Sequence, residues 1–366
     1  MINQLPDCLL CEILFHLPTE DVVRTSLVCR RWRNLWQDVP GLDLEIDGFA
    51  KYEFFNRFMD LNSGLRLQIV KLRYHRCIGY NYVKPTLNTV FKQKIQRLDV
   101  ESNRRCELVE IPPTIYTSCL EMLISACPAL ETLTMDKMYI PKVSSQSLLS
   151  FSLTTHEENE YPRTQVLMQT PGLKYLKLKR HFIARIIIDD LSSIVTLDLD
   201  DLTNFGESFP NFLTLISCVR NLTISVDILE VIRRFSKSES LRRFHNLSTL
   251  SVKGMKFGSW ESLLVLLESC PNLKSLFMGF RIGSYGRDFL YVPHCVLSSL
   301  EFVEVKAKHL ANMEKLGSFF LQNSTVLRKL TLCLDHIKEQ DSVILAQLIA
   351  LPRRSNTCEV VARSRT

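Results

Sequence analysis

Glycine is scarce in this sequence, with 12 among 366 residues. The chain has no glycine-rich phosphate loop, no His-Glu-x-x-His metal motif and no Gly-x-Ser-x-Gly nucleophile motif. Its eight histidines are isolated, and none stands at metal-ligand spacing from another. These absences exclude the common motif-bearing enzyme classes, and we expect no catalytic residue, no metal and no cofactor.

Long apolar runs are also missing. The longest candidates, such as residues 263–267, are bounded by Glu261 and Glu268 and fall well short of the roughly 20 residues that span a bilayer. Met1 leads directly into a helix-forming pattern, without the basic start and apolar core of a secretory signal. We therefore expect no membrane association and an intracellular chain, in the cytoplasm, the nucleus or both.

Neither charge nor cysteine is concentrated in one segment. The formal net charge of +6 is spread along the chain, and the basic pairs lack interleaved aromatic residues, so nucleic acid is not an expected partner. The 12 cysteines are scattered, which favours packed thiols in a reducing compartment over disulfides. Cys8 and Cys11 form a Cys-x-x-Cys with no second pair at zinc spacing, and we expect both to pack on a helix.

The first forty residues carry a helical pattern. Apolar residues recur at three- and four-residue steps and form one broad stripe: Leu5, Leu9, Leu10, Ile13, Leu14 and Leu17. Pro6 suits a first helical turn, and Leu17-Pro18 ends the helix. Thr19 is predicted to cap a second helix with Val22, Val23 and Leu27. A third helix is predicted to carry Val28, Trp32, Leu35 and Trp36.

Three helices in about 35 residues bury too little surface to be stable alone. The pattern by itself favours a helical cap on the following domain, but the residues are more specific. Leu5-Pro6-Asp7-x-Leu9-Leu10-x-x-Ile13-Leu14-x-x-Leu17-Pro18 is followed by Asp21-Val22-Val23-Arg24-Thr25-Ser26, and then by Leu27-Val28-Cys29-Arg30-Arg31-Trp32-Arg33-x-Leu35-Trp36. In order and spacing these residues resemble the F-box nearly end to end.

The resemblance implies a partner. The F-box family docks a Skp-type adaptor, which ties it to a cullin–RING ubiquitin ligase. It implies that ten residues contribute to the adaptor contact or support it: Leu5, Pro6, Leu9, Ile13, Leu14, Leu17, Pro18, Val28, Cys29 and Trp32. Cys8 and Cys11 depart from the family, which more often has polar or acidic residues at these positions.

The middle of the chain repeats a short cassette of the form apolar-x-x-apolar-x-apolar. Most copies are about 21 to 28 residues apart, which is leucine-rich-repeat spacing. The last two apolar residues share one face of a strand, and one repeat cannot cover that face, so the repeats must stack. The copies begin at Leu67, Ile95, Leu130, Leu148, Leu173, Ile194, Val219, Leu247, Leu273, Leu300 and Leu327.

The cassettes resemble the degenerate leucine-rich repeats found behind plant F-boxes, and the alternative is an ordinary α/β domain with parallel strands. The last part of the chain resembles the FBD domain that closes many such proteins. Its expected elements are a helix over Asn312–Asn323, a strand over Leu327–Leu332 and a helix over Asp341–Leu351.

The predicted fold is therefore α/β in three parts. A three-helix F-box occupies residues 1–40. An irregular leucine-rich-repeat solenoid of parallel strands and return helices occupies 41–290, and an FBD cap occupies 291–366. In a stacked array the terminal repeats need a polar outer cover, which is the structural role that we expect of the FBD segment.

The exposed strand residues predict where a target binds. Side chains between the buried leucines line one exposed face, and two central strands place six of them there: Tyr175, Lys177, Lys179, Thr196, Asp198 and Asp200. If these strands are neighbours in register, Lys177 faces Asp198 and Lys179 faces Asp200. The small, polar lining favours a protein or peptide surface over a deep small-molecule pocket.

The F-box resemblance implies a substrate-recognition subunit of an SCF-type (Skp–cullin–F-box) ubiquitin ligase, with an unidentified target protein on the repeats. Such a subunit is not catalytic, because other subunits carry out the transfer. Two alternatives stay open at this point. One is a repeat scaffold whose F-box-like helices no longer bind an adaptor, and the other is a small-molecule-gated receptor of the same architecture.

Overall fold

The computed structural model of the chain falls into two compact units. The first comprises Met1–Leu176 and Arg185–Ser193, and the second comprises Lys177–Ala184 and Ile194–Thr366. The structure describes residues 2–61, 67–75, 86, 89–90, 94–103, 124, 127–137, 142–154, 166–179, 186–188, 192–200, 209–237, 240–280, 291–307, 313–334, 346 and 349–364.

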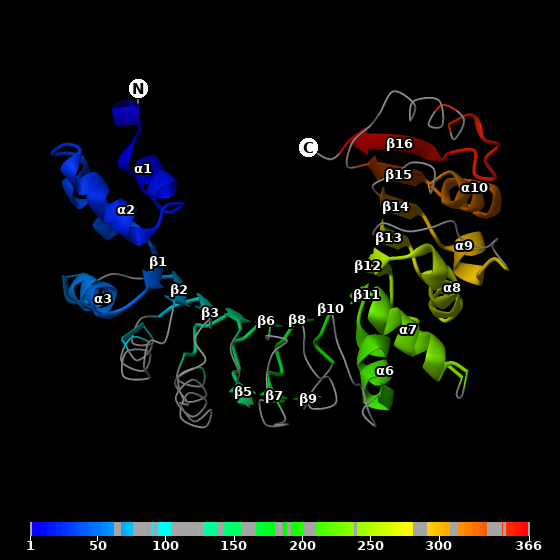
Figure 1. Cartoon of the computed structure of the whole chain (residues 1–366), viewed down its shortest axis with the longest axis horizontal. Helices are drawn as coiled ribbons and strands as arrows, with labels where there is room; N and C mark the ends of the chain where they lie inside the picture. The colour runs from blue at the N-terminus through cyan, green and yellow to red at the C-terminus, as the bar shows by residue number, and fades with distance from the viewer. Residues whose placement is uncertain are drawn as a thin grey trace. The chain divides into compact units, whose positions relative to one another are not determined.

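Short helical elements open the first unit (Figure 1). Helix α1 spans Asp7–Leu14, α2 spans Thr19–Arg24, and a 3₁₀ helix spans Trp32–Asp38. Shorter 3₁₀ turns lie at Ile2–Gln4 and Thr25–Leu27. The predicted order of three helices is confirmed, but the third is a 3₁₀ helix that begins only after Val28.

Thr19 does not cap α2, contrary to the sequence prediction. Pro18 occupies the N-cap position with φ −54° and ψ 142°, and no side chain caps this helix. The hydroxyl of Thr19 instead accepts a hydrogen bond from the backbone N–H of Asp43, at 2.8 Å. Because Pro18 already supplies the extended residue before the helix, Thr19 becomes the first helical residue and joins α2 to the first strand.

Parallel strands follow in the first unit. Their order is β1 (Gly41–Ile46), β2 (Ile69–His75), β3 (Arg97–Asn103), β4 (Thr132–Asp136), β6 (Ser150–Thr154) and the start of β8 (Tyr175–Lys179). Strands β1 to β6 pair in parallel. A second parallel sheet runs β5 (Lys142–Ser144), β7 (Val166–Gln169), β9 (Ile186–Ile188). The cassette pattern does not reveal this second sheet, because its strands have only three or four residues.

The second unit alternates strands with helices. Its strands follow the order β10 (Thr196–Asp200), β11 (Asn221–Ser225), β12 (Thr249–Met255), β13 (Ser275–Phe280), β14 (Phe302–Ala307), β15 (Lys329–Leu334) and β16 (Glu359–Ser364), all paired in parallel. The helices lie along one side of these strands (Figure 1): α6 (Phe209–Cys218), α7 (Val226–Phe235), α8 (Trp260–Glu268), α9 (His294–Ser298) and α10 (Met313–Asn323).

The predicted C-terminal helix over Asn312–Asn323 is confirmed as α10, with Leu316, Phe319 and Phe320 buried. The predicted strand over Leu327–Leu332 corresponds to β15. Most of the helix predicted over Asp341–Leu351 lies outside the described residues.

The repeated cassettes form the core. The three apolar residues of all eleven predicted copies are buried, and the last two lie on a strand. The residue between these two is exposed or half-buried in ten copies, and in the copy that begins at Leu327 it is the buried Thr331. The predicted α/β fold with parallel strands is therefore confirmed. A further copy, Val39-x-x-Leu42-x-Leu44, is also buried and forms β1. It escaped the prediction because it follows directly on the helical motif.

Two recurring polar contacts hold neighbouring strands at a constant spacing. The residue just before a strand accepts two backbone N–H groups from the next repeat, as the Arg220 carbonyl does from Ser248 and Thr249 at 2.9 and 3.1 Å. A serine hydroxyl also donates to the carbonyl of the first cassette leucine in the preceding repeat. The pairs are Ser147 with Leu130 at 2.8 Å, Ser299 with Leu273 at 3.0 Å and Ser355 with Leu327 at 2.7 Å.

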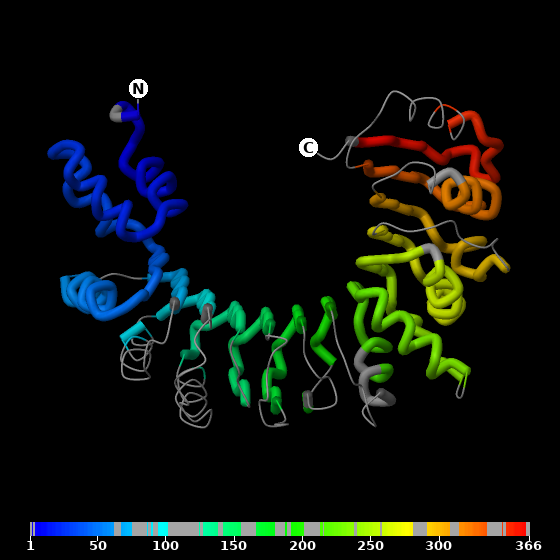
Figure 2. The backbone as a smooth tube through the Cα atoms, in the orientation of Figure 1, coloured from blue at the N-terminus to red at the C-terminus, as the bar shows by residue number. Residues whose placement is uncertain are grey.

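The N-terminal helices pack directly on β1 and on α3 (Phe49–Leu61), and Figure 2 follows the backbone through this junction. The ring centroids of Trp36 and Phe58 lie 5.6 Å apart, and Lys51 of α3 pairs with Glu20 of α2 at 3.1 Å. A Cβ atom on Gly41 would clash with Cε2 of the Phe15 ring. The glycine therefore permits the helices and the first strand to pack as one body.

We predict that Gly41→Ala lowers the free energy of unfolding by about 1–3 kcal/mol, because the added methyl group overpacks the Phe15 ring. Gly258→Ala is the matched control, since its added Cβ meets no heavy atom within 4 Å. Urea unfolding followed by tryptophan fluorescence measures both variants. Equal stability of the two would show that the Phe15 ring moves aside without cost.

Candidate functional site

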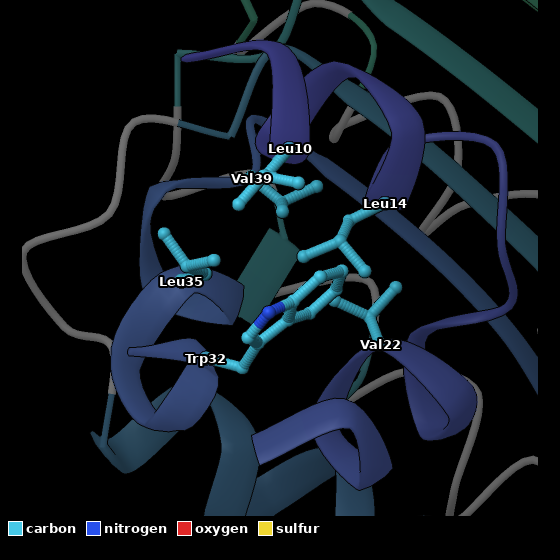
Figure 3. Close-up of a cluster of buried hydrophobic side chains, with 6 residues drawn as sticks. All are labelled: Leu10, Leu14, Val22, Trp32, Leu35 and Val39. Atoms are coloured by element: carbon cyan, nitrogen blue, oxygen red, sulfur yellow. The ribbon is translucent and has the colours of Figure 1, made fainter. Parts of the chain in front are cut away.

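The N-terminal helices enclose a small core of their own. Figure 3 shows Leu10 and Leu14 of α1, Val22 of α2, and Trp32, Leu35 and Val39 with their side chains directed toward one another. The half-buried side chains of Leu5, Cys11, Phe15 and Trp36 pack against this cluster. Leu14 and Trp32, two of the ten predicted adaptor residues, therefore support the surface from inside, and Leu5 lies at its margin.

The other seven predicted adaptor residues are exposed: Pro6, Leu9, Ile13, Leu17, Pro18, Val28 and Cys29. In α1, Leu9 and Ile13 are one turn apart and are 48% and 41% exposed, while Leu10 and Leu14 face the core. The single predicted apolar stripe thus splits into a buried face and an exposed face. Exposed leucine and isoleucine at helical spacing form a surface that can bind an apolar partner.

Leu27 and Ile2 are exposed apolar residues that the predicted set lacked, at 86% and 50%. Six of the fourteen exposed large hydrophobic side chains among the described residues lie between Ile2 and Val28, so the apolar exposure is concentrated here. The sequence predicts Leu27 among the apolar residues of the second helix, but α2 ends at Arg24 and a 3₁₀ turn follows. This change of helical period turns Leu27 to the outside.

Arg31 fixes the start of α1 to the segment before the 3₁₀ helix. Its Nε and Nη2 atoms donate to Oδ1 of Asp7 at 2.9 and 2.6 Å, and Nη2 also donates to the carbonyl of Leu5. Both side chains are partly exposed, so the ion pair contributes only about 0–1 kcal/mol. Its structural effect is to hold Leu5 and Pro6 in place beside the exposed face of α1.

The six predicted target-binding residues lie on β8 and β10 and are all half-buried, alternating with buried leucines. Tyr175 belongs to the first unit, and the other five belong to the second. In the second unit, Thr196 accepts a hydrogen bond from Nδ2 of Asn221 at 3.1 Å. The strand face therefore presents polar groups that are already engaged with their neighbours.

The predicted pair of Lys179 and Asp200 is confirmed, with Nζ 3.5 Å from Oδ2. Asp198, which the register predicts to face Lys177, forms its ion pair with Lys253, at 2.9 and 3.2 Å from its two oxygens. Lys253 lies two strands away and precedes Gly254, whose φ of +72° accompanies a register shift in β12. Such a bulge redirects side chains, and the cassette pattern gave no sign of it.

Opposite charges on this strand face largely cancel. Among the described residues, Lys177 has no carboxylate within ion-pair distance, whereas Lys179 and Lys253 are each matched by an aspartate. The face therefore offers hydrogen-bonding groups more than net charge. This favours recognition by shape and polar contacts.

The described residues contain no cluster of three or more histidine, cysteine, aspartate or glutamate side chains that could hold a metal ion. Cys8 is exposed and Cys11 is half-buried on α1, where its Sγ donates to the carbonyl of Leu35 at 3.7 Å. Burial, followed by the nearby carboxylates of Asp38 and Asp7, raises the pKa of the Cys11 thiol. In the part of the chain that the structure describes, no helix is both long and apolar enough to cross a membrane.

Comparison with known proteins gives the same two terminal assignments. The F-box domain model matches residues 2–43, and the FBD model matches residues 288–332. An Arabidopsis thaliana protein named for F-box, FBD and LRR repeat is 58% identical, over 100% of this chain and 94% of that protein. F-box/LRR-repeat protein 13 of Arabidopsis thaliana is 36% identical, over 98% and 95%.

The buried helical cluster, the parallel strands and the two domain matches define an F-box protein with a parallel-strand repeat region and an FBD domain. More closely, the chain belongs to the F-box/FBD/LRR-repeat family found in Arabidopsis thaliana.

We predict that the exposed Cys8 and Cys29 react with iodoacetamide before the core cysteines. Burial raises the pKa of the Cys127 thiol to about 11 and that of Cys295 to about 12, so little reactive thiolate forms there at mildly alkaline pH. A time course by peptide mass spectrometry measures each site, with the urea-unfolded protein as control. Modification of Cys295 as fast as Cys8 in the folded protein would contradict the packing.

Proposed function

We propose that this chain is the substrate-recognition subunit of an SCF-type ubiquitin ligase. Its F-box docks a Skp-type adaptor, and its repeats hold a target protein. The observation that carries the proposal is the exposed apolar face of α1, with Leu9 and Ile13 outside a closed core. F-box domains in general bind Skp-type adaptors, and the match at residues 2–43 supports the same role here.

The energetics of this face favour a partner. Fully burying a leucine or isoleucine side chain stabilises a complex by about 1.5–3 kcal/mol. Leu9, Ile13, Leu17, Leu27 and Val28 are all at least 39% exposed. The small core behind them is closed without their help, so their burial requires another surface.

The strand face supplies the second half of the proposal. The residues that we propose for target binding are Tyr175, Lys177, Lys179, Thr196, Asp198 and Asp200, which line β8 and β10 beside Asn221 and Lys253. Half-buried polar side chains with matched charges suit a protein or peptide surface. In this proposal the chain supplies no catalytic group. We propose that it acts in the cytoplasm or the nucleus.

We predict that Leu9→Ala with Ile13→Ala abolishes capture of a Skp-type adaptor, or weakens it at least about tenfold, because two central apolar contacts are lost. Stability should change by less than about 0.5 kcal/mol per exposed site. Pull-down of the purified adaptor and urea unfolding measure the two effects separately.

The matched control is Phe49→Ala with Leu61→Ala, which removes two exposed apolar side chains from α3. We expect this variant to capture the adaptor as the unmodified chain does. Undiminished capture by the α1 variant would disprove the docking assignment. Absence of adaptor binding by the unmodified chain would instead favour a repeat scaffold without a ligase role.

Cysteine reactivity gives an independent footprint. Cys29, a proposed contact residue, and Cys218 in the second unit are both exposed. We expect saturating Skp-type adaptor to slow alkylation of Cys29 and to leave Cys218 unchanged, because a docked protein covers the first thiol alone. Equal rates at Cys29 with and without the adaptor would place the interface elsewhere on the F-box.

A further inference from the structure

The residues that immediately precede strands β11 to β15 form a row along the starting edge of the second unit's sheet. The first four carbonyls of this row each accept two N–H groups from the next repeat, at 2.8 to 3.2 Å, and the carbonyl of Arg328 accepts one from Glu359 at 2.8 Å. Backbone hydrogen bonds therefore fix each position of the row, and its side chains start from points separated by the distance between neighbouring strands. The row consists of Arg220, Ser248, Lys274, Glu301 and Arg328.

Every second position of this row carries an exposed cation. Arg220 is exposed, and the side chains of Lys274 and Arg328 are 63% and 67% exposed. Among the described residues Arg220 has no carboxylate partner within ion-pair distance. The small side chain of Ser248 separates the first two cations in the row.

Two further arginines lie a few residues before Ser248 in sequence. Arg242 and Arg243 are exposed in the segment before β12, and this segment is anchored. Its Phe244 is fully buried and its backbone N–H donates to the carbonyl of Ser269 at 2.7 Å. The backbone carbonyl of the next residue, His245, accepts a hydrogen bond from Nδ2 of Asn272 at 2.9 Å. Asn272 lies two residues before Lys274 in sequence. We call Arg220, Arg242, Arg243, Lys274 and Arg328 the strand-start strip.

A carboxylate already occupies part of the strip. Glu301 lies between Lys274 and Arg328, with Oε1 3.6 Å from Nζ of the lysine and Oε2 3.2 Å from Nε of the arginine. Its side chain is only 21% exposed. The strip is thus shown to accommodate carboxylate groups, and this internal glutamate neutralises one of five cations.

We propose that the strand-start strip binds an extended acidic segment of a protein, with a carboxylate at about every third residue. Adjacent strands lie about 4.7–4.9 Å apart, so cations on alternate strands are spaced by about 9.5 Å. A polyproline II segment rises about 3.1 Å per residue and repeats after three residues, or about 9.3 Å. The two periods match, and each carboxylate meets one cation.

A protein segment fits the strip better than nucleic acid does. None of the strip residues is aromatic, and the exposed Phe302 after Glu301 supplies a single ring instead of the series on which successive bases stack, whereas the guanidinium groups of the strip suit carboxylates. If the bound segment is part of a ligase target, that identity rests on the proposed function. Binding of the segment itself does not rest on it.

The test uses the full chain and fluorescein-labelled peptides. One peptide carries aspartate at every third position, and the second has the same composition with its aspartates contiguous. Fluorescence anisotropy measures the affinity of each at low and high salt. We expect tighter binding of the spaced peptide, and binding that weakens as salt screens the exposed charges.

Three variants sharpen the result. Arg220→Glu with Lys274→Glu and Arg328→Glu should weaken binding of the spaced peptide more than about tenfold, since three ion pairs are lost. The control Arg234→Glu with Lys237→Glu and Lys256→Glu makes the same charge change at exposed positions off the strip and should retain most of the affinity. Glu301→Gln should raise the affinity about two- to fivefold, because it frees Lys274 and Arg328.

The proposal is overturned if the strip and control variants weaken binding equally, if both peptides bind alike, or if neither binds. It is also overturned if single-stranded RNA or duplex DNA binds more tightly than the spaced peptide. Unchanged affinity after Glu301→Gln would count against the strip even if the triple variant failed to fold. Adaptor capture by the strip variant tests the ligase role separately, so the failure of either idea can be recognised.

Discussion

Each strand of this protein depends on the next repeat to cover its apolar side and to satisfy its backbone. The cassette leucines are buried only because neighbouring strands stack in parallel. The carbonyl before most strands of the main sheet, such as that of Lys274, accepts two N–H groups from the following repeat. Serines such as Ser299 then satisfy the carbonyl of the first leucine in the previous cassette. The surfaces that carry function are therefore held in position by contacts between repeats.

The F-box differs from the repeats, because it is too small to bury all its apolar residues. Adjacent positions on α1 have opposite surroundings: Leu10 and Leu14 are buried in the core, and Leu9 and Ile13 are exposed. The F-box can remain folded in water with these side chains exposed, because its core closes without them and without a partner. The strand face of the second unit differs in character, since its lysines and aspartates are paired with each other. One chain thus presents an apolar surface and a charge-balanced polar surface.

Much of the fold was predictable because it depends on short-range periodicity. The spacing of apolar residues predicts all eleven cassettes and α10, because residues that must be buried recur at fixed positions along a strand or helix. Features that depend on contacts distant in sequence were not predictable. Helix α2 ends at Arg24, and Leu27 after it is exposed. The bulge at Gly254 redirects Lys253, which forms an ion pair with Asp198. The strand-start strip was not predictable for the same reason, since Arg220, Lys274 and Arg328 are far apart in sequence and are aligned only when the repeats stack.

The junction between the F-box and the first strand has a consequence for protein engineering. Phe15 packs against Gly41, Thr19 bonds to Asp43, and Trp36 stacks near Phe58. A fragment cut after the F-box motif would expose one side of each of these contacts to water. The smallest transplantable module is therefore the segment through Leu61, which keeps β1 and α3 with the helices. Chimeras that exchange F-boxes between relatives should place their splice site beyond that helix.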